Sequence, residues 1–207
     1  MKFILGRKLN MSQIYDASGA AIPVTLIAAR PNVVTQVRTK DADGYEALQL
    51  GEGARKPSRI AKAQKGQWGD IGSFAAIREF RSPASSSELP ATLKVGDKVE
   101  LSQFQPGDTV MVSAVSKGKG FQGVVKRHGF RGGPRSHGQK HSEREPGSIG
   151  GGLRSRVPVG TRMAGRMGSD RITVKNLKIV HVDPQESLLY VSGAVPGRRG
   201  TLVEIVG

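Results

Sequence analysis

Cysteine is absent from this 207-residue sequence. The lack of thiols excludes disulfide bridges and thiolate metal sites, and it is typical of proteins from a reducing compartment. Apolar runs are short, well below the roughly 20 residues that a membrane-spanning helix needs. The N-terminal stretch also lacks the longer apolar run and the small-residue cleavage site of a signal peptide. The sequence therefore predicts a cytoplasmic protein with no membrane partner.

Acidic residues are scarce relative to basic ones. Lys and Arg number 32 against 17 Asp and Glu, which gives a formal net charge of +15. Such an excess repels itself, so it favours a polyanionic partner. A membrane surface is the less favoured polyanion, because no basic helix with a clean apolar face is evident. The composition thus indicates that the partner is a nucleic acid.

The excess charge is concentrated in residues 117–171. This segment holds 13 basic and 3 acidic residues, a net of +10, whereas residues 1–116 carry +4 and residues 172–207 carry +1. It also holds 14 of the 28 glycines. Few of its residues are apolar, so burying them cannot offset the conformational entropy that the segment would lose by becoming ordered on its own. A plain linker is one interpretation, but scattered apolar residues favour a segment that becomes ordered on RNA: Phe121, Phe130, Ile149, Leu153, Met163 and Met167.

The flanking regions are rich in β-branched residues and are punctuated by Gly, Pro, Asp and Asn. Many short strands with such turns predict a mainly β barrel or sandwich. The final strands must return to the sheet begun within residues 1–116, so 117–171 is an insertion. Strands are expected at 21–29, 32–39, 45–51, 109–115, 172–183, 188–195 and 202–206.

Residues 53–80 differ from the strand-rich stretches that precede them, and we interpret 53–105 as an inserted region. Within it, 58–68 is expected to form a short helix, with Ser58 as its N-cap and Gly69 as its stop. Residues 172–207 supply the closing strands.

A literal G-x-G-x-x-G occupies residues 118–123, directly after an expected strand. A dinucleotide site needs this loop to open a helix inside a βαβ unit, and a kinase needs H-R-D and D-F-G motifs downstream. Here Gly129, Gly132 and Pro134 stop any helix within two turns. We interpret the loop as a close approach to an RNA backbone. A nucleotide-using enzyme is a rival that a nucleotide titration would exclude.

Three histidines lie close together at His128, His137 and His141. Only Glu143 and Glu145 are carboxylates within reach, and no zinc-protease motif is present. We therefore expect no metal, no cofactor and no catalytic residue. Imidazoles beside Arg and Lys favour stacking on bases or bonding to phosphate and 2′-OH groups.

Arginine dominates over lysine in this segment, nine to four. The planar guanidinium engages phosphate bidentately and stacks on bases, which suits contacts inside folded RNA. The predicted RNA-binding residues are Lys117, Lys119, Lys126, Arg127, His128, Arg131, Arg135, His137, Lys140, His141, Arg144, Arg154, Arg156, Arg162, Arg166 and Arg171.

Three blocks, at 6–27, 118–150 and 160–197, closely resemble the L-three family of bacterial large-subunit ribosomal proteins. The most specific of them is "GKGFQGVVKRHGFRGGPRSHGQKHSEREPGSIG" at 118–150. The resemblance implies a six-stranded β-barrel of the translation-protein type, with an inserted small α/β region and a long, irregular basic extension. A non-ribosomal RNA chaperone or regulator is the alternative from charge alone.

The resemblance also implies a role. Family members are structural constituents that bind 23S-type rRNA and neighbouring ribosomal proteins, organise subunit assembly, and extend toward the peptidyl transferase centre. It implies no small-molecule substrate. The implied tip of the extension consists of Pro146, Gly147, Ser148, Ile149, Gly150, Gly151, Gly152 and Leu153. Many relatives continue after "PGSIG" with Gln-Asn-Gln, whose glutamine is methylated in some, and this chain lacks that glutamine.

Overall fold

A computed structural model describes residues 2–81, 93–151 and 156–207. The chain divides into two compact units, one formed by Met1–Val115 with Arg171–Gly207 and the other by Ser116–Asp170. These boundaries lie within a residue of the expected limits of the basic segment. None of the described helices is long and apolar enough to cross a membrane.

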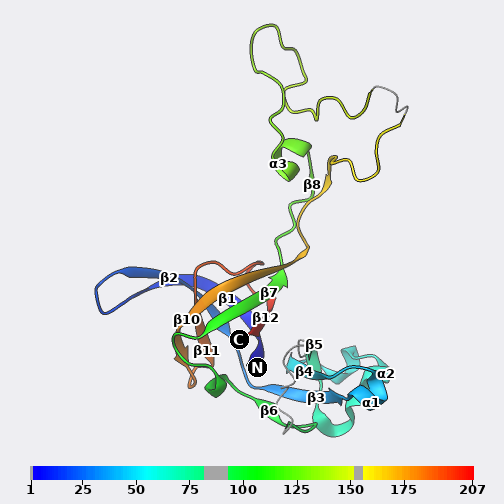
Figure 1. The fold of residues 1–207 in the computed structure, drawn as a ribbon. Coiled ribbons are helices and arrows are strands. Elements are labelled where there is room, and N and C mark those ends of the chain that lie inside the picture. The colour runs from blue at the N-terminus through cyan, green and yellow to red at the C-terminus, as the bar shows by residue number, and fades with distance from the viewer. Residues whose placement is uncertain (1, 82–92, 152–155) are drawn as a thin grey trace. The chain divides into compact units, whose positions relative to one another are not determined.

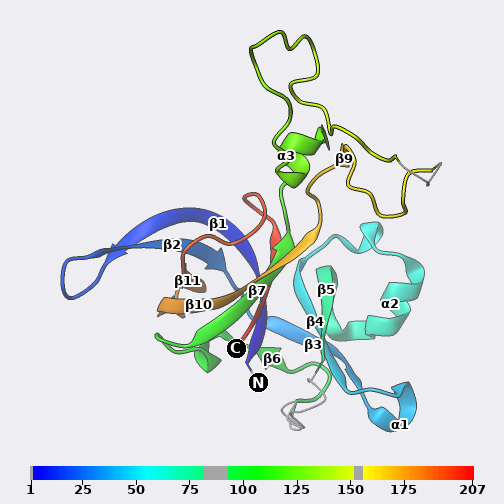
Figure 2. The same ribbon diagram turned by 45° about the horizontal axis from the view of Figure 1, so that its top comes forward.

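Within the described residues, six antiparallel strands of the first unit close into a barrel (Figures 1 and 2). The strand order is β1-β12-β7-β10-β11-β2. The chain leaves the barrel after β7 and re-enters it at β10, which pairs directly with β7. The strands are β1 (Phe3–Tyr15), β2 (Ala21–Ala28), β7 (Thr109–Val115), β10 (Arg171–Asp183), β11 (Leu188–Ser192) and β12 (Leu202–Val206).

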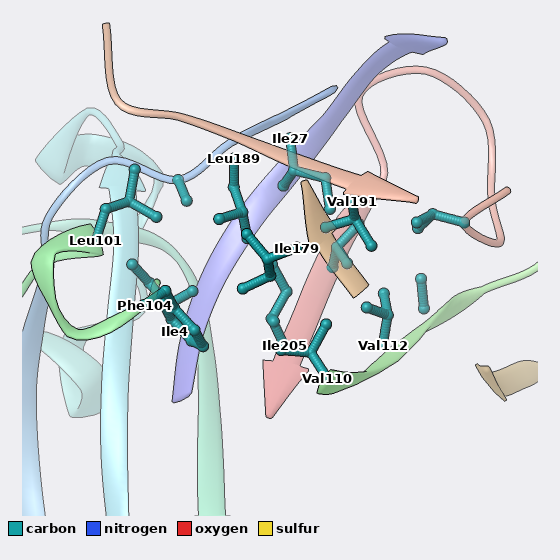
Figure 3. Close-up of a cluster of buried hydrophobic side chains, with 14 residues drawn as sticks. Ile4, Ile27, Leu101, Phe104, Val110, Val112, Ile179, Leu189, Val191 and Ile205 are labelled. Carbon is teal, nitrogen blue, oxygen red and sulfur yellow. The ribbon is translucent and has the colours of Figure 1, made fainter. Parts of the chain in front are cut away.

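The barrel interior is filled by alternate residues of its strands (Figure 3). In β12, for example, Val203 and Ile205 are buried while their neighbours are partly exposed, as a period of two requires. A 3-10 turn at Leu101–Gln103 adds Leu101 and the following Phe104 to the same cluster. Each such aliphatic side chain contributes about 1.5–3 kcal/mol of hydrophobic stabilisation.

A second sheet, of four strands among the described residues, has the order β5-β4-β3-β6 (Figure 2). It takes in β3 and β4, which begin before the region 53–105. Its strands and accompanying helices are β3 (Asn32–Arg38), α1 (Lys40–Asp43), β4 (Ala47–Ala54), α2 (Lys62–Trp68), β5 (Phe74–Arg81) and β6 (Lys98–Val99), with 3-10 turns at Pro57–Arg59 and Gly69–Ile71.

Strand β1 is buried on both faces at its start. Ile4 points into the barrel cluster, whereas Phe3 and Leu5 belong to the cluster that contains the second sheet. The Phe3 ring stacks on Phe80 of β5 with centroids 5.0 Å apart. One strand therefore serves two hydrophobic cores and joins the sheet to the barrel.

Asn32 reinforces this junction by a polar contact. Its side chain accepts a hydrogen bond from the Leu5 N–H at 2.6 Å and donates to the Leu5 carbonyl at 3.2 Å. The residue is fully buried. Because a buried amide group without a partner is costly, this pairing fixes where the chain enters β3.

Glu79 of β5 lies at the centre of a small polar network. It accepts hydrogen bonds from Arg38 Nε at 2.8 Å and from the Tyr45 hydroxyl at 3.1 Å. Burial raises the pKa of Glu79, but the hydrogen bonds from Arg38 and Tyr45 outweigh it, so the pKa lies below its ordinary value. The carboxylate therefore stays charged near neutral pH.

The predicted mainly β fold with a six-stranded barrel is confirmed, and all seven expected strands exist. The strands expected at 109–115 and 202–206 have the predicted ends, and the other five differ from prediction at one or both ends. Two long strands, β1 and β5, were not predicted. The helix expected at 58–68 is shorter, and the assignment of Ser58 as its N-cap is wrong because Ser58 lies in the 3-10 turn before it. Ile60 is extended and packs with Trp68 and Phe74, which breaks the helix there.

Replacing Asn32 by Ala leaves the buried Leu5 N–H and C=O without their partner. We expect the free energy of unfolding to fall by about 2–3 kcal/mol, measured by urea denaturation. The matched variant Asn10→Ala, at an exposed position of β1, should change stability by less than about 0.5 kcal/mol. Equal effects would contradict the role of Asn32.

Candidate nucleic-acid interface

The unit Ser116–Asp170 begins and ends as a two-stranded ribbon. The Ser116 N–H donates to the Asp170 carbonyl at 2.9 Å, and the short strands β8 (Phe121–Gln122) and β9 (Gly165–Arg166) pair in antiparallel fashion. These two strands were not predicted. The outgoing arm, which follows β7, and the returning arm, which leads into β10, are thus joined by backbone hydrogen bonds.

A five-residue helix, α3 (Val124–His128), follows β8 and ends at Gly129. Strand β8 occupies the two residues before the last glycine of the G-x-G-x-x-G sequence. The next strand, β9, pairs with β8 in antiparallel fashion, so these elements do not form the parallel βαβ unit. The motif therefore lacks the structure that a dinucleotide-binding loop requires.

Two of the predicted RNA-binding residues, Arg127 and His128, contact a backbone carbonyl of their own chain. Arg127 Nη1 donates to the Met163 carbonyl at 2.8 Å, and His128 Nε2 lies 3.0 Å from the same oxygen. Both side chains are half-buried. They tie α3 on the outgoing arm to the returning arm, a contact that residue type alone could not reveal.

The loop beyond Phe130 folds back on itself. The Gly133 N–H donates to the Glu143 carbonyl at 2.9 Å, and the Arg135 guanidinium pairs with the Glu143 carboxylate at 3.0 Å. Gly132 is required by close approach, because a Cβ there would lie 2.1 Å from the Glu143 carbonyl oxygen. The loop encloses an open hollow of about 640 Å³, whose lining includes Phe130, Arg131, Gln139, Ser142 and Glu145.

Most predicted RNA-binding side chains are exposed to solvent. Among the described residues of 116–170, Val124 is the one buried side chain and Arg135–Glu143 the one ion pair. Apart from Arg135, the exposed cationic groups of this unit therefore have no ion-pair partner among its described residues. The exposed members are Lys117, Lys119, Lys126, Arg131, Arg135, His137, Lys140, His141, Arg144, Arg156, Arg162, Arg166 and Arg171.

The implied tip is exposed from Pro146 to Gly151. Gly152, Leu153 and Arg154 lie outside the described residues. Of the apolar residues predicted as anchors, Phe130, Met163 and Met167 are half-buried, whereas Phe121 and Ile149 are exposed. No three His, Asp or Glu side chains of the described chain are grouped so that they could hold a metal ion.

A contact on the barrel side was missed by sequence analysis. Glu204 of β12 accepts hydrogen bonds from both Arg78 of β5 and Arg171, the first residue of β10. The carboxylate thus offsets part of the charge at Arg171, which was predicted to bind RNA. Only the folded register brings these three residues together.

Comparison with known proteins identifies the family. Residues 91–193 match the family model for ribosomal protein L3. The chain is 50% identical over 204 residues to the large ribosomal subunit protein uL3 of Roseiflexus sp. (strain RS-1), covering 98% of this chain and 95% of the relative. The chain belongs to the uL3 family. The uL3 protein of Chloroherpeton thalassium is 47% identical over 209 residues, covering 100% of this chain and 99% of the relative.

Membership of the uL3 family confirms the resemblance seen in the sequence. Because uL3 proteins are structural rather than enzymatic components of a ribonucleoprotein, the nucleotide-using enzyme is rejected as an interpretation. The basic unit is accordingly described as a candidate nucleic-acid interface and not as an active site.

Arg127→Ala removes a donor to the Met163 carbonyl, whereas Arg131→Ala removes an exposed side chain from the same unit. Without this charged hydrogen bond, the association of the two arms should weaken by about 1 kcal/mol. Amide hydrogen exchange of peptides spanning 160–168 should then be roughly fivefold faster in Arg127→Ala only. Identical exchange in both variants would show that Arg127 does not hold the arms together.

Proposed function

We propose that the chain is a structural constituent of the large ribosomal subunit that binds 23S-type rRNA directly through residues 117–171. The observation that carries the proposal is the outward display of cationic side chains on a unit with one buried side chain among its described residues. Such a unit gains little from its own packing, and a polyanion supplies the missing interactions.

The chemistry of the exposed groups fits folded RNA. Arginine forks bond two phosphate oxygens at once, and each neutralised phosphate releases condensed counterions. The ribbon at 116–122 and 165–170 gives these side chains a defined backbone instead of a fluctuating chain. The entropic cost of ordering the segment on binding is therefore smaller.

The family supports a finer assignment. In this proposal the extension runs toward the peptidyl transferase centre with Pro146–Leu153 at its tip, while the barrel contacts neighbouring ribosomal proteins. The protein acts early, by holding rRNA segments together during subunit assembly, and it resides on ribosomes in the bacterial cytoplasm. Support comes from the bacterial relatives, which are named as large-subunit proteins and are covered over nearly their whole length.

A triple variant tests the direct contact with RNA. Replacing Arg131, Arg144 and Arg162 by Gln should weaken binding to large-subunit rRNA. It should also reduce the slope of log K against log salt by up to about one for each phosphate that is no longer neutralised. Filter binding from low to moderate salt measures both quantities.

The control replaces three exposed arginines of the other unit, Arg30, Arg198 and Arg199, and makes the same change in net charge. It should leave most of the salt slope intact. If both triple variants reduce the slope equally, binding depends on total charge alone, as a non-ribosomal RNA chaperone would allow, and the proposed interface is wrong.

A further inference from the structure

Phe121 has an unusual position for a large apolar residue. Its side chain is 77% exposed, although it lies in a strand and in the least apolar part of the chain. Within the described residues, no second aromatic ring and no guanidinium lies over its ring. Most of the Phe121 side chain is therefore accessible to a partner. A single exposed apolar residue is common on protein surfaces, so its surroundings must decide whether it has a role.

A β-bulge precedes Phe121 and sets its direction. Lys119 N–H donates to the Met167 carbonyl at 2.9 Å, and Met167 N–H donates to the Gly120 carbonyl at 3.0 Å, so two residues of one arm oppose one of the other. Gly120 has φ +68°, the left-handed conformation that such a bulge uses. Bulges redirect side chains, and this one fixes the backbone from which the Phe121 ring projects.

Most charged side chains of the ribbon that contains Phe121 are cationic. Phe121 pairs directly with Arg166 on β9, so the two side chains leave the ribbon on the same face. Lys117 and Lys119 precede it on the outgoing arm, and all three cations are exposed. Asp170 is the acidic residue of the ribbon. An exposed ring among cations matches the surface on which single-stranded nucleic acids stack their bases while the cations hold phosphates.

We infer that Phe121 is a stacking platform for an unpaired nucleobase of RNA, and that Arg166 binds a phosphate beside that base. The inference rests on the proposed function and assigns it a specific contact. A base suits the site better than an apolar protein surface, because the cations around the ring would be desolvated against such a surface without a counter-charge. Stacking is non-ionic, so its contribution is separable from that of the arginines.

Two substitutions at Phe121 test the platform in the full-length protein. Phe121→Leu keeps an apolar side chain without a π face, and Phe121→Trp keeps the π face. Phe121→Leu should weaken binding to large-subunit rRNA about tenfold or more with an unchanged salt slope. Phe121→Trp should bind as wild type. Hydrogen exchange of peptides 116–122 and 163–170 checks that the ribbon is intact in both variants.

The added indole also reports the contact directly. The natural Trp68 is 2% exposed and belongs to the other unit, so its fluorescence provides a constant background. Fluorescence from Phe121→Trp should be quenched on binding, because the indole stacks on a base. Unchanged affinity in Phe121→Leu overturns the inference, and so does a blue shift without quenching, which would indicate burial against an apolar surface. If wild-type protein fails to bind the rRNA, the proposed function fails as well.

Discussion

The pairing of β7 with β10 is the interaction on which the rest of the structure depends. It sets Val115 opposite Arg171, so both ends of the basic segment start from adjacent strands of one barrel. A segment with a net charge of +10 and few apolar residues cannot hold its own ends together. The hydrophobic core of the barrel offsets the entropic cost of closing this long loop. The side chains of the segment are therefore not needed to hold its ends together.

The pairing of β7 with β10 also determines how the two arms begin. Because the arms start side by side, their first residues continue as a ribbon, with Lys119 and Gly120 bonded to Met167. Farther along, Arg127 and His128 bond the Met163 carbonyl across the arms. The unit is thus held by backbone bonds and a few polar contacts rather than by a core. Its cations remain available to a partner, and the family supplies the identity of that partner class.

Much of the fold could be predicted from the sequence, because one-sided strands carry a period of two. In β7, Val110, Val112 and Ala114 recur at every second position and face the barrel cluster, and the strand end at Val115 is marked by the change to Gly and Lys. Strand β1 was missed for a physical reason. Its first residues are buried on both faces between two cores, so they show no alternation. Its later residues mix polar and apolar side chains and are partly or fully exposed.

The residue types of the proposed interface could be predicted from the sequence. Which of them bond within the chain and which face solvent could not. Charge mapping placed the proposed interface in residues 117–171, and most of the cations in the described part of that segment are exposed. It could not separate Arg127, which bonds a carbonyl of its own chain, from Arg131, which faces solvent. Nor could it show that Phe121, expected as an anchor, projects outward, because that depends on the bulge at Gly120 and on its register with β9.

The most direct measurement of the central claim is photo-crosslinking of intact large subunits that have been washed in high salt. The protein should sediment with the subunit, and its peptides crosslinked to rRNA should come mainly from 117–151 and 156–171. Recovery of the protein free of the subunit, or crosslinks confined to the barrel strands, would contradict the account.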